Sequence, residues 1–507
     1  MNLSNQSSPI SSGNSSARSL ALVRAWPLLL LAGGFLIYAS SMTIWYVGDD
    51  FQYFWAEPSR HLVRYFVEPN PNHGFYRPVN TMINAATQVL FGWSTWPIHL
   101  INILFHALLA WTLFRFMRRE GFGDGAAMIG SGFLLASQVG AAAVLQTDTF
   151  SQIAGTCFGV WSLLLMHRAY NPASERRLLL YLASLGSMAL SLASKETSVA
   201  YLPMIALILW LRPASSFTAR LFACMRDALP FVLLGILYLW WRWAIGLSQP
   251  GGEEGTYAYV FGTNILRNLV QLVVALTTPL STVRGFDAIV DRDPVMLALL
   301  AIGCGGLIMS TLYGLLRAKN VPSLLRVVGL MAILAFLPVY PLHHVGELYA
   351  YNALPFVAVI IGAGLGEVYR RAWRLRWTAL VAVIGAALYL AANILAIHEK
   401  GEMLREEGER ARRMIGAITP VIRSLPDGAE LILLNPPGAP PDYSVYRQKG
   451  FDVFEWGTHV FEVVTGRTDV RYRLVDTLPP PSSRPRVVLT LHGDSVVPYH
   501  ERPSIDR

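Results

Sequence analysis

Apolar segments about as long as a lipid bilayer is thick recur along this chain of 507 residues. A helix needs about 20 mainly apolar residues to cross a bilayer, because each residue advances it by only about 1.5 Å. Segments near or above this length occur at about residues 26–46, 98–116, 125–145, 149–167, 178–194, 197–212, 228–246, 294–316, 327–342, 352–369 and 377–397. Charged residues make up 15% of the chain, against about 25% in soluble domains. The sequence therefore predicts an all-α polytopic membrane domain with about eleven transmembrane helices.

Basic residues indicate how these helices are oriented. If the N-terminus is cytoplasmic, the inner side receives Arg18, Arg24, Arg115, Arg118, Arg119, Arg168, Arg176, Arg177, Arg212, Arg220, Arg226, Arg317, Lys319, Arg326, Arg370, Arg371, Arg374 and Arg376. Cytoplasmic loops are generally enriched in such residues. The apolar run 262–281 would break this pattern as a span, so we expect a re-entrant or interfacial helix there. The net charge of +8 follows from topology and does not indicate a nucleic-acid partner.

The two ends of the chain differ in composition from the membrane part. Residues 1–25 begin with a Ser- and Asn-rich stretch that predicts a disordered cytoplasmic tail, and residues 26–397 form the membrane domain. Residues 398–507 predict a small external α/β domain that begins with a charged helix over 399–425. Its strands are expected at 430–434, 460–464, 471–475 and 486–491. We expect a bacterial inner-membrane protein with this domain in the periplasm.

Asp49 and Asp50 are the first candidate site residues. They follow the first apolar segment and open an outer loop from about residue 47 to residue 97. Neighbouring carboxylates raise each other's pKa, and they are retained more readily where a metal, a cation or an acceptor proton offsets them. A loop acid or a helix N-cap is the alternative for each. The segments 50–67 and 79–92 have the apolar spacing of helices that lie along the membrane surface.

Other candidates lie at the outer ends of the predicted spans. Asp148, Glu196 and Glu347 each occupy a very short turn between apolar segments, where an acid needs a partner to offset its desolvation. Lys195 either clamps a phosphate or pairs with an acid nearby. Arg77, between Tyr76 and Pro78, either meets a lipid phosphate or is an ordinary snorkelling arginine.

Two polar groups complete the set of candidates. One outer turn combines groups suited to a sugar or a phosphate headgroup, although interfacial tyrosines also serve as membrane anchors: Tyr340, His343, His344, Glu347, Tyr349 and Tyr351. His99, Asn102 and His106 share one helical face, where we expect packing or support rather than direct metal ligation. The three cysteines form no CxxC pair and support neither a zinc site nor a disulfide framework. No cofactor is certain, and a divalent metal stays an open alternative.

The order of the motifs resembles that of the GT-C superfamily of integral membrane glycosyltransferases. The resemblance covers about residues 26–397 and rests on Asp49-Asp50, FYRPV at 75–79, HLINILFH at 99–106, SKET at 194–197 and ELY at 347–349. Within the superfamily, the chain looks most like the protein O-mannosyltransferases and the tetratricopeptide-containing transmembrane mannosyltransferases. The tetratricopeptide repeats are missing, and Leu348 stands where relatives carry an arginine.

The resemblance implies an enzyme that transfers a sugar from a polyprenyl-phosphate carrier to a glycan, lipid or protein acceptor on the non-cytoplasmic face. Asp49 or Asp50 would be catalytic, while Arg77, Lys195, His344 and Tyr349 would bind the donor and its phosphate. The supporting residues would be Tyr76, His99, Asn102, His106, Asp148, Glu196 and Glu347. Partners would be the lipid-linked sugar, the acceptor and membrane lipids. A flippase for lipid-linked saccharides and an oligosaccharide polymerase or ligase are the alternatives.

Overall fold

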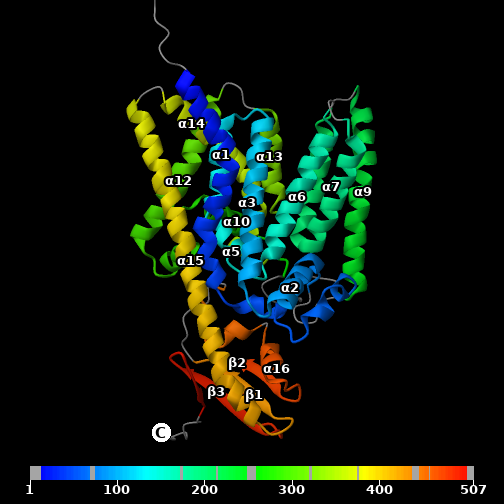
Figure 1. Cartoon of the computed structure of the whole chain (residues 1–507), viewed down its shortest axis with the longest axis vertical. Helices are drawn as coiled ribbons and strands as arrows, with labels where there is room; N and C mark the ends of the chain where they lie inside the picture. The colour runs from blue at the N-terminus through cyan, green and yellow to red at the C-terminus, as the bar shows by residue number, and fades with distance from the viewer. Residues whose placement is uncertain are drawn as a thin grey trace, which may run out of the picture.

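The protein is a helical bundle with a small sheet at one end, here called the sheet end (Figure 1). The computed structural model describes residues 13–68, 75–171, 175–212, 215–247, 258–318, 322–373, 376–436, 445–455 and 457–499. The bundle contains α1 Gly13–Tyr38, α3 Trp96–Arg119, α4 Asp124–Ala136, α5 Val139–Val144, α6 Phe150–Ala169, α7 Arg177–Ser194, α8 Tyr201–Trp210, α9 Phe217–Ala244, α10 Asn264–Thr277, α11 Thr282–Val290, α12 Pro294–Arg317, α13 Leu324–Leu334, α14 Leu354–Ala372 and α15 Arg376–Ser424.

Several of these helices have the length and apolarity of membrane spans. Within the described residues, six such segments are found at Ala21–Thr43, Trp96–Arg119, Arg177–Ser194, Phe217–Ala244, Pro294–Arg317 and Trp377–Ser424. The chain is thus an integral membrane protein, and the count of eleven spans stays a prediction. Residues 1–12 of the expected tail lie outside the described residues, and α1 already begins at Gly13.

The predicted run 125–145 is interrupted between α4 and α5. The backbone N–H of Gln138 donates to Oδ1 of Asn393, 2.9 Å away, and its side chain donates to the carbonyl of Ala275, also at 2.9 Å. The first of these bonds occupies a backbone N–H that a continuous helix would use itself. The predicted run 327–342 is likewise helical only as far as Leu334.

The first loop lies across the sheet end. Residues 79–92 form a helix as predicted, α2 Pro78–Phe91, which Figure 1 shows below the bundle. The predicted helix over 50–67 is wrong, because the chain forms three short 3₁₀ helices instead: η2 Gly48–Tyr53, η3 Pro58–His61 and η4 Arg64–Phe66. All side chains from Asp50 to Trp55 are buried, so this stretch has no solvent-facing side for an amphipathic helix to present.

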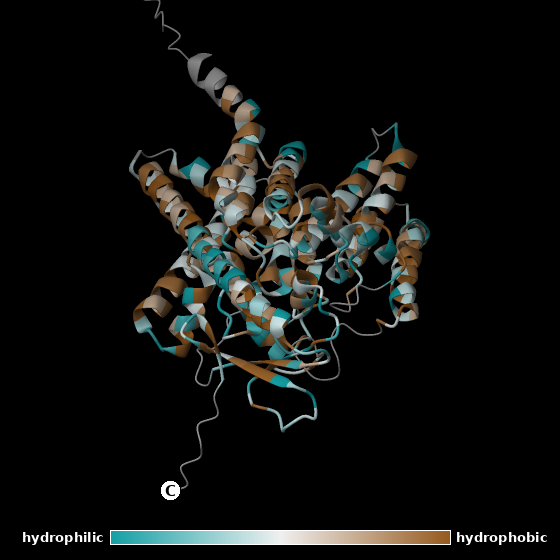
Figure 2. Ribbon diagram, turned by 60° about the horizontal axis from the view of Figure 1, so that its bottom comes forward, coloured by the Kyte–Doolittle hydropathy of each residue, from teal (hydrophilic) through white to brown (hydrophobic). Residues whose placement is uncertain are grey.

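Helix α15 leads from the bundle to the sheet without a break (Figure 1). Figure 2 shows that it changes from apolar to hydrophilic along its length. The sheet has the order β2-β1-β3-β4, with strands β1 Glu430–Leu434, β2 Arg471–Val475, β3 Arg486–His492 and β4 Ser495–Pro498. The central β1 is parallel to β2 and β3 and buried along its whole length.

The predicted strand at 460–464 is wrong, because these residues lie in α16 His459–Thr465. The helix ends at Gly466, which adopts the left-handed conformation (φ 72°) typical of a helix C-terminus. The apolar side chains Val460 and Phe461 are buried against the rest of the domain. A short apolar run of this kind does not distinguish a strand from a helix.

Candidate active site

The two adjacent aspartates have different environments. The carboxylate of Asp50 is fully buried and accepts hydrogen bonds from the backbone N–H groups of Val47 (3.1 Å), Thr147 (2.9 Å) and Asp148 (2.9 Å). Burial raises its pKa to about 6, and these bonds act in the opposite direction. Asp50 therefore ties η2 to the turn between α5 and α6, and its oxygens are already occupied.

This connection brings Asp49 close to Asp148. The pKa of the Asp49 carboxyl is raised to about 7, chiefly by burial and then by the charge of Asp148, against the lowering effect of Arg77 and Lys195. Burial and the charge of Asp50 likewise raise the pKa of Asp148 to about 7. Oδ1 of Asp148 is buried with no hydrogen-bond partner among the described residues. The pKa values of both carboxyls therefore lie near neutral pH, where either can take up or release a proton.

Cationic side chains lie beside these acids. Arg77, which precedes α2, donates to both oxygens of Glu196, from Nε at 2.9 Å and from Nη2 at 2.6 Å. Lys195, where α7 ends, is also buried, and burial followed by the charge of Arg77 lowers its pKa to about 8. No described residue accepts a hydrogen bond from its ammonium group. The arrangement suits an anionic group held between Lys195 and Arg77.

Gly155 allows the turn that carries Lys195 to pack against α6. A Cβ atom added there would lie 2.9 Å from Oγ of Ser198 and 3.3 Å from Cβ of Lys195. Oγ of Ser191 also donates to the carbonyl of Gly155, 2.6 Å away. The position of Lys195 therefore depends on a small residue in the neighbouring helix.

The sequence did not point to three residues that lie in this group: Arg242, Tyr238 and Tyr53. Arg242 of α9 is buried and interacts electrostatically with Glu196, while its Nη1 donates to the hydroxyl of Tyr238, 3.3 Å away. Tyr53 of η2 is fully buried, beside Asn80 and close to the charges of Arg77 and Asp148. An arginine at the end of an apolar helix ordinarily snorkels to the membrane surface, so no pattern around residue 242 predicted that Arg242 is buried.

Three predicted supporting residues share one face of α3 and contact neighbouring segments. His99 Nε2 lies 3.2 Å from the carbonyl of Ile44, and His106 Nδ1 lies 2.7 Å from the hydroxyl of Tyr351. Asn102 donates to the carbonyl of Gln146, 2.7 Å away. These contacts join segments far apart in the sequence around the acid-bearing turns.

Tyr76 connects two parts of the first loop, because its hydroxyl donates to the carbonyl of Phe66, 2.8 Å away. Its ring also packs at 6.2 Å, centroid to centroid, against that of Tyr238 in α9. Tyr76 therefore helps to place Arg77, its neighbour in sequence, beside the helices.

Glu347 belongs to a different network from the Asp49 group. It begins η6 Glu347–Asn352, and its Oε2 accepts from Nζ of Lys400 in α15, 2.6 Å away. Its Oε1 accepts from the hydroxyl of Tyr446, 2.8 Å away, and the hydroxyl of Thr282 donates to Oε2. Lys400 is fully buried and also donates to Gln138. These contacts connect the membrane part to the C-terminal region, residues 398–499.

The structure does not place His344 in the Asp49 group. His344 is exposed, in the turn before η6, beside Arg267 and His343. Tyr349 lies half-buried in η6 and packs against the main core. Among the described residues, no three His, Cys, Asp or Glu side chains are grouped as metal ligands, and we assign no residue to a metal.

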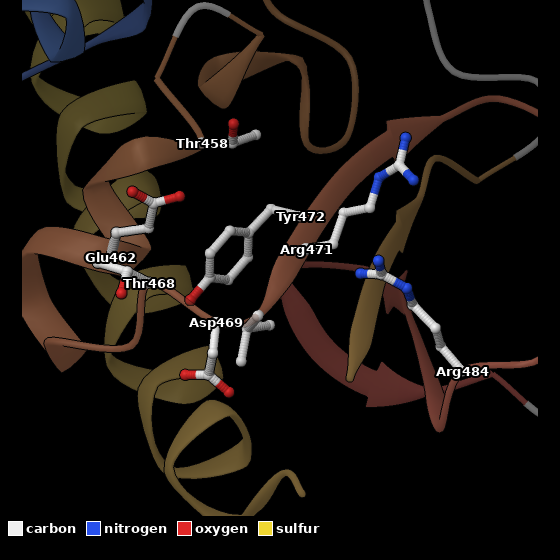
Figure 3. A pocket seen from close by; sticks show the side chains of 8 residues that line it. Thr458, Glu462, Thr468, Asp469, Arg471, Tyr472 and Arg484 are labelled. Atoms are coloured by element: carbon white, nitrogen blue, oxygen red, sulfur yellow. The ribbon is translucent and has the colours of Figure 1, made fainter. Parts of the chain in front are cut away.

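A separate hollow of about 370 Å³ opens between α16 and β2 (Figure 3). Its lining consists of Thr458, Glu462, Thr468, Asp469, Val470, Arg471, Tyr472 and Arg484. Figure 3 shows the two guanidinium groups on one side and the two carboxylates on the other. Asp469 is paired with Arg467, with Oδ1 lying 2.7 Å from Nε. None of the predicted site residues lines this hollow.

The arrangement of the helices is similar to that of two proteins of known structure. ArnT from Cupriavidus metallidurans, bound to undecaprenyl phosphate, matches with a TM-score of 0.53 and 16% identity over 90% of each chain. The apo oligosaccharyltransferase of Archaeoglobus fulgidus matches with a TM-score of 0.53 and 13% identity, over 91% of this chain and 65% of its own.

The same archaeal protein, AglB, in complex with an inhibitory peptide and a dolichol-phosphate, gives a TM-score of 0.51 at 12% identity, over 89% of this chain and 64% of its own. The chain has a GT-C-like fold. No protein-family model and no curated protein matches the sequence. At these identities the GT-C-like likeness establishes the fold, and the chemistry has to be argued from the residues.

Proposed function

We propose that this chain is a glycosyltransferase that moves a sugar from a polyprenyl-phosphate carrier to an acceptor on the non-cytoplasmic side of the membrane. The observation that carries the proposal is the juxtaposition of Asp49, whose pKa is raised to about 7, with the cations Lys195 and Arg77. ArnT binding undecaprenyl phosphate and AglB binding dolichol-phosphate on the same fold support a lipid phosphate as the leaving group.

In this mechanism Asp49 is the general base. Its carboxylate takes the proton of an acceptor hydroxyl while that oxygen attacks the anomeric carbon of the donor sugar. The bond between the anomeric carbon and the phosphate oxygen breaks, and its electron pair leaves with the lipid phosphate. Lys195 and Arg77 hold the resulting negative charge, since charge-assisted contacts to phosphate are stronger than neutral ones. Glu196 fixes the guanidinium of Arg77 in place.

The finer assignments are part of the same proposal. We assign the chain to the hexosyltransferase type and, by its motifs, next to the O-mannosyltransferase branch, in a bacterial inner membrane with the sheet end in the periplasm. The acceptor is a glycan, lipid or protein. We restrict the catalytic role to Asp49, because backbone N–H groups already occupy the carboxylate of Asp50.

The test is incubation of purified protein in lipid nanodiscs with polyprenyl-phosphate-linked sugars and a panel of acceptors. We expect free polyprenyl phosphate and glycosylated acceptor in equal amounts. If no donor is consumed across the panel, and labelled lipid instead crosses the membrane of proteoliposomes, the chain is a flippase and the proposal is wrong.

A further inference from the structure

The C-terminal region packs directly on η2, the short helix that carries Asp49. The rings of Phe51 in η2 and Phe454 lie 5.3 Å apart, centroid to centroid. Gly457 approaches even more closely, since a Cβ atom added there would lie 2.3 Å from Cβ of Phe51. Real Cβ atoms essentially never come so close, so either the turn or residue 457 would have to move.

A polar contact accompanies this apolar one. The ring of His459, the first residue of α16, is hydrogen-bonded to the backbone of Phe51 and of Phe54, at the end of η2. On its other side, Phe51 packs against Trp45 and Tyr46, with centroids 5.8 and 6.2 Å away. The turn is thus enclosed between the chain that leaves α1 and the C-terminal region.

The C-terminal region is itself fixed to the membrane part. The hydroxyl of Tyr446 donates to Glu347, and the guanidinium of Arg447 donates to both oxygens of Asp287, each at 2.9 Å. Helix α15 also packs closely against the chain that leaves α1, where a Cβ atom added at Gly408 would lie 3.2 Å from the backbone of Trp45. The surface that contacts η2 therefore has a defined position relative to the bundle.

We propose that the C-terminal region positions the base, with Phe454, Gly457 and His459 acting as positioning residues for Asp49. The inference rests on the proposed function. Asp50 ties η2 to the α5–α6 turn through the backbone N–H groups of Thr147 and Asp148, while its third bond, from Val47, lies within the first turn of η2 itself. A 3₁₀ helix of six residues is a weak element by itself, so its rotation depends on what packs on its other face. A displacement of about 1 Å at a reacting group costs about 100-fold in rate.

The test compares two Gly→Ala variants of the full chain. Gly457→Ala places a carbon against Phe51, whereas Gly416→Ala places one on the exposed face of α15 with nothing within 4 Å. We expect Gly457→Ala to lower kcat by at least about 10-fold with the KM for the donor within about 2-fold, because Lys195 and Arg77 do not lie on the turn. Gly416→Ala should behave as the wild type.

A second readout does not depend on catalysis. Hydrogen exchange of the amides of residues 47–54 should become faster in Gly457→Ala and stay unchanged in Gly416→Ala. His459→Ala should likewise lower kcat, and His459→Gln, which keeps an N–H donor, should restore part of it.

The outcomes separate this inference from the proposed function. An unchanged kcat in Gly457→Ala, with or without faster exchange, would overturn the positioning role. An equal loss of kcat in Leu489→Ala, a change in the middle of the sheet, would also overturn it by showing a merely structural effect. A wild-type protein without transfer activity would instead overturn the proposed function itself.

Discussion

At the scale of single residues, the backbone separates two aspartates that the sequence presents as equivalent. Asp50 is held by three N–H groups, whereas the carboxylate of Asp49 lies within electrostatic range of Asp148 and the cations Arg77 and Lys195. One residue therefore shapes the turn, and the other is available for proton transfer. The sequence alone left open which of the two was catalytic.

Replacing Asp50 by Asn should destabilise the turn. An amide has only one acceptor oxygen, so its NH₂ group would face a backbone N–H of Val47, Thr147 or Asp148. We expect a loss of about 1–3 kcal/mol in the free energy of unfolding, together with slower transfer. Thermal unfolding in detergent, with Asp49→Asn as the matched control, measures this loss. Equal unfolding midpoints for Asp50→Asn and the wild type would contradict the structural role of Asp50.

The pH dependence of transfer should be bell-shaped. The base must be deprotonated, so the rate should rise as the pH increases through about 7, the pKa of both Asp49 and Asp148. Lys195 must be protonated to hold phosphate, so the rate should fall as the pH passes about 8. In Lys195→Arg the guanidinium stays charged, and the alkaline limb should disappear from the measurable range. An alkaline limb that is the same in wild type and Lys195→Arg would refute this assignment.

At the scale of elements, the sequence predicted the helices that are long and apolar enough to cross a membrane. It was wrong where tertiary partners decide the local structure. In 50–67 the side chains from Asp50 to Trp55 are all buried, and in 460–464 the residues form a helix that ends at Gly466. Gln138 interrupts a predicted helix for the same reason, because its partners Asn393 and Ala275 are distant in sequence.

The candidate site was likewise predictable only where tertiary partners did not decide which residues meet. Asp49, Asp148 and the Lys195-Glu196 pair come together because each closes a turn at the same end of neighbouring helices. Glu347 also closes such a turn, yet it pairs with Lys400 of α15. The residues next to Glu347 in the sequence do not indicate this pairing. Arg242 escaped notice because its burial depends on Glu196, 46 positions earlier in the numbering.

The packing of α6 against the α7–η5 turn gives a prediction at this scale. Gly155→Ala should displace Ser198 and Lys195, and we expect the KM for the lipid-linked donor to rise by at least about 10-fold. Gly186→Ala in α7 is the matched control, because its added Cβ meets nothing within 4 Å. Steady-state kinetics over a range of donor concentrations measures both. Identical KM values for the two variants would mean that Lys195 does not depend on this contact.

At the scale of the whole molecule, a GT-C-like membrane part and a sheet-bearing C-terminal region meet around the first loop. Lys400 and Tyr446, both from the C-terminal region, converge on Glu347 of the membrane part. The acids and cations of the candidate site lie at this same end of the bundle.

The orientation of the chain is open to a direct labelling test. In a background without Cys157, Cys224 and Cys304, Ser495→Cys in β4 should react with a membrane-impermeant maleimide in spheroplasts. Ser216→Cys, exposed at the start of α9, should react only after the membrane is permeabilised. The reverse pattern would place the candidate site on the cytoplasmic side.

The central claim is that Asp49 removes the acceptor proton while Lys195 and Arg77 hold the departing lipid phosphate. The most direct measurement is single-turnover release of polyprenyl phosphate by wild type and Asp49→Asn at saturating acceptor. The amide keeps the shape of the side chain but cannot act as a base, so release should slow by about 10²- to 10⁴-fold while donor affinity stays within about 2-fold. Release at the wild-type rate from Asp49→Asn would contradict the claim.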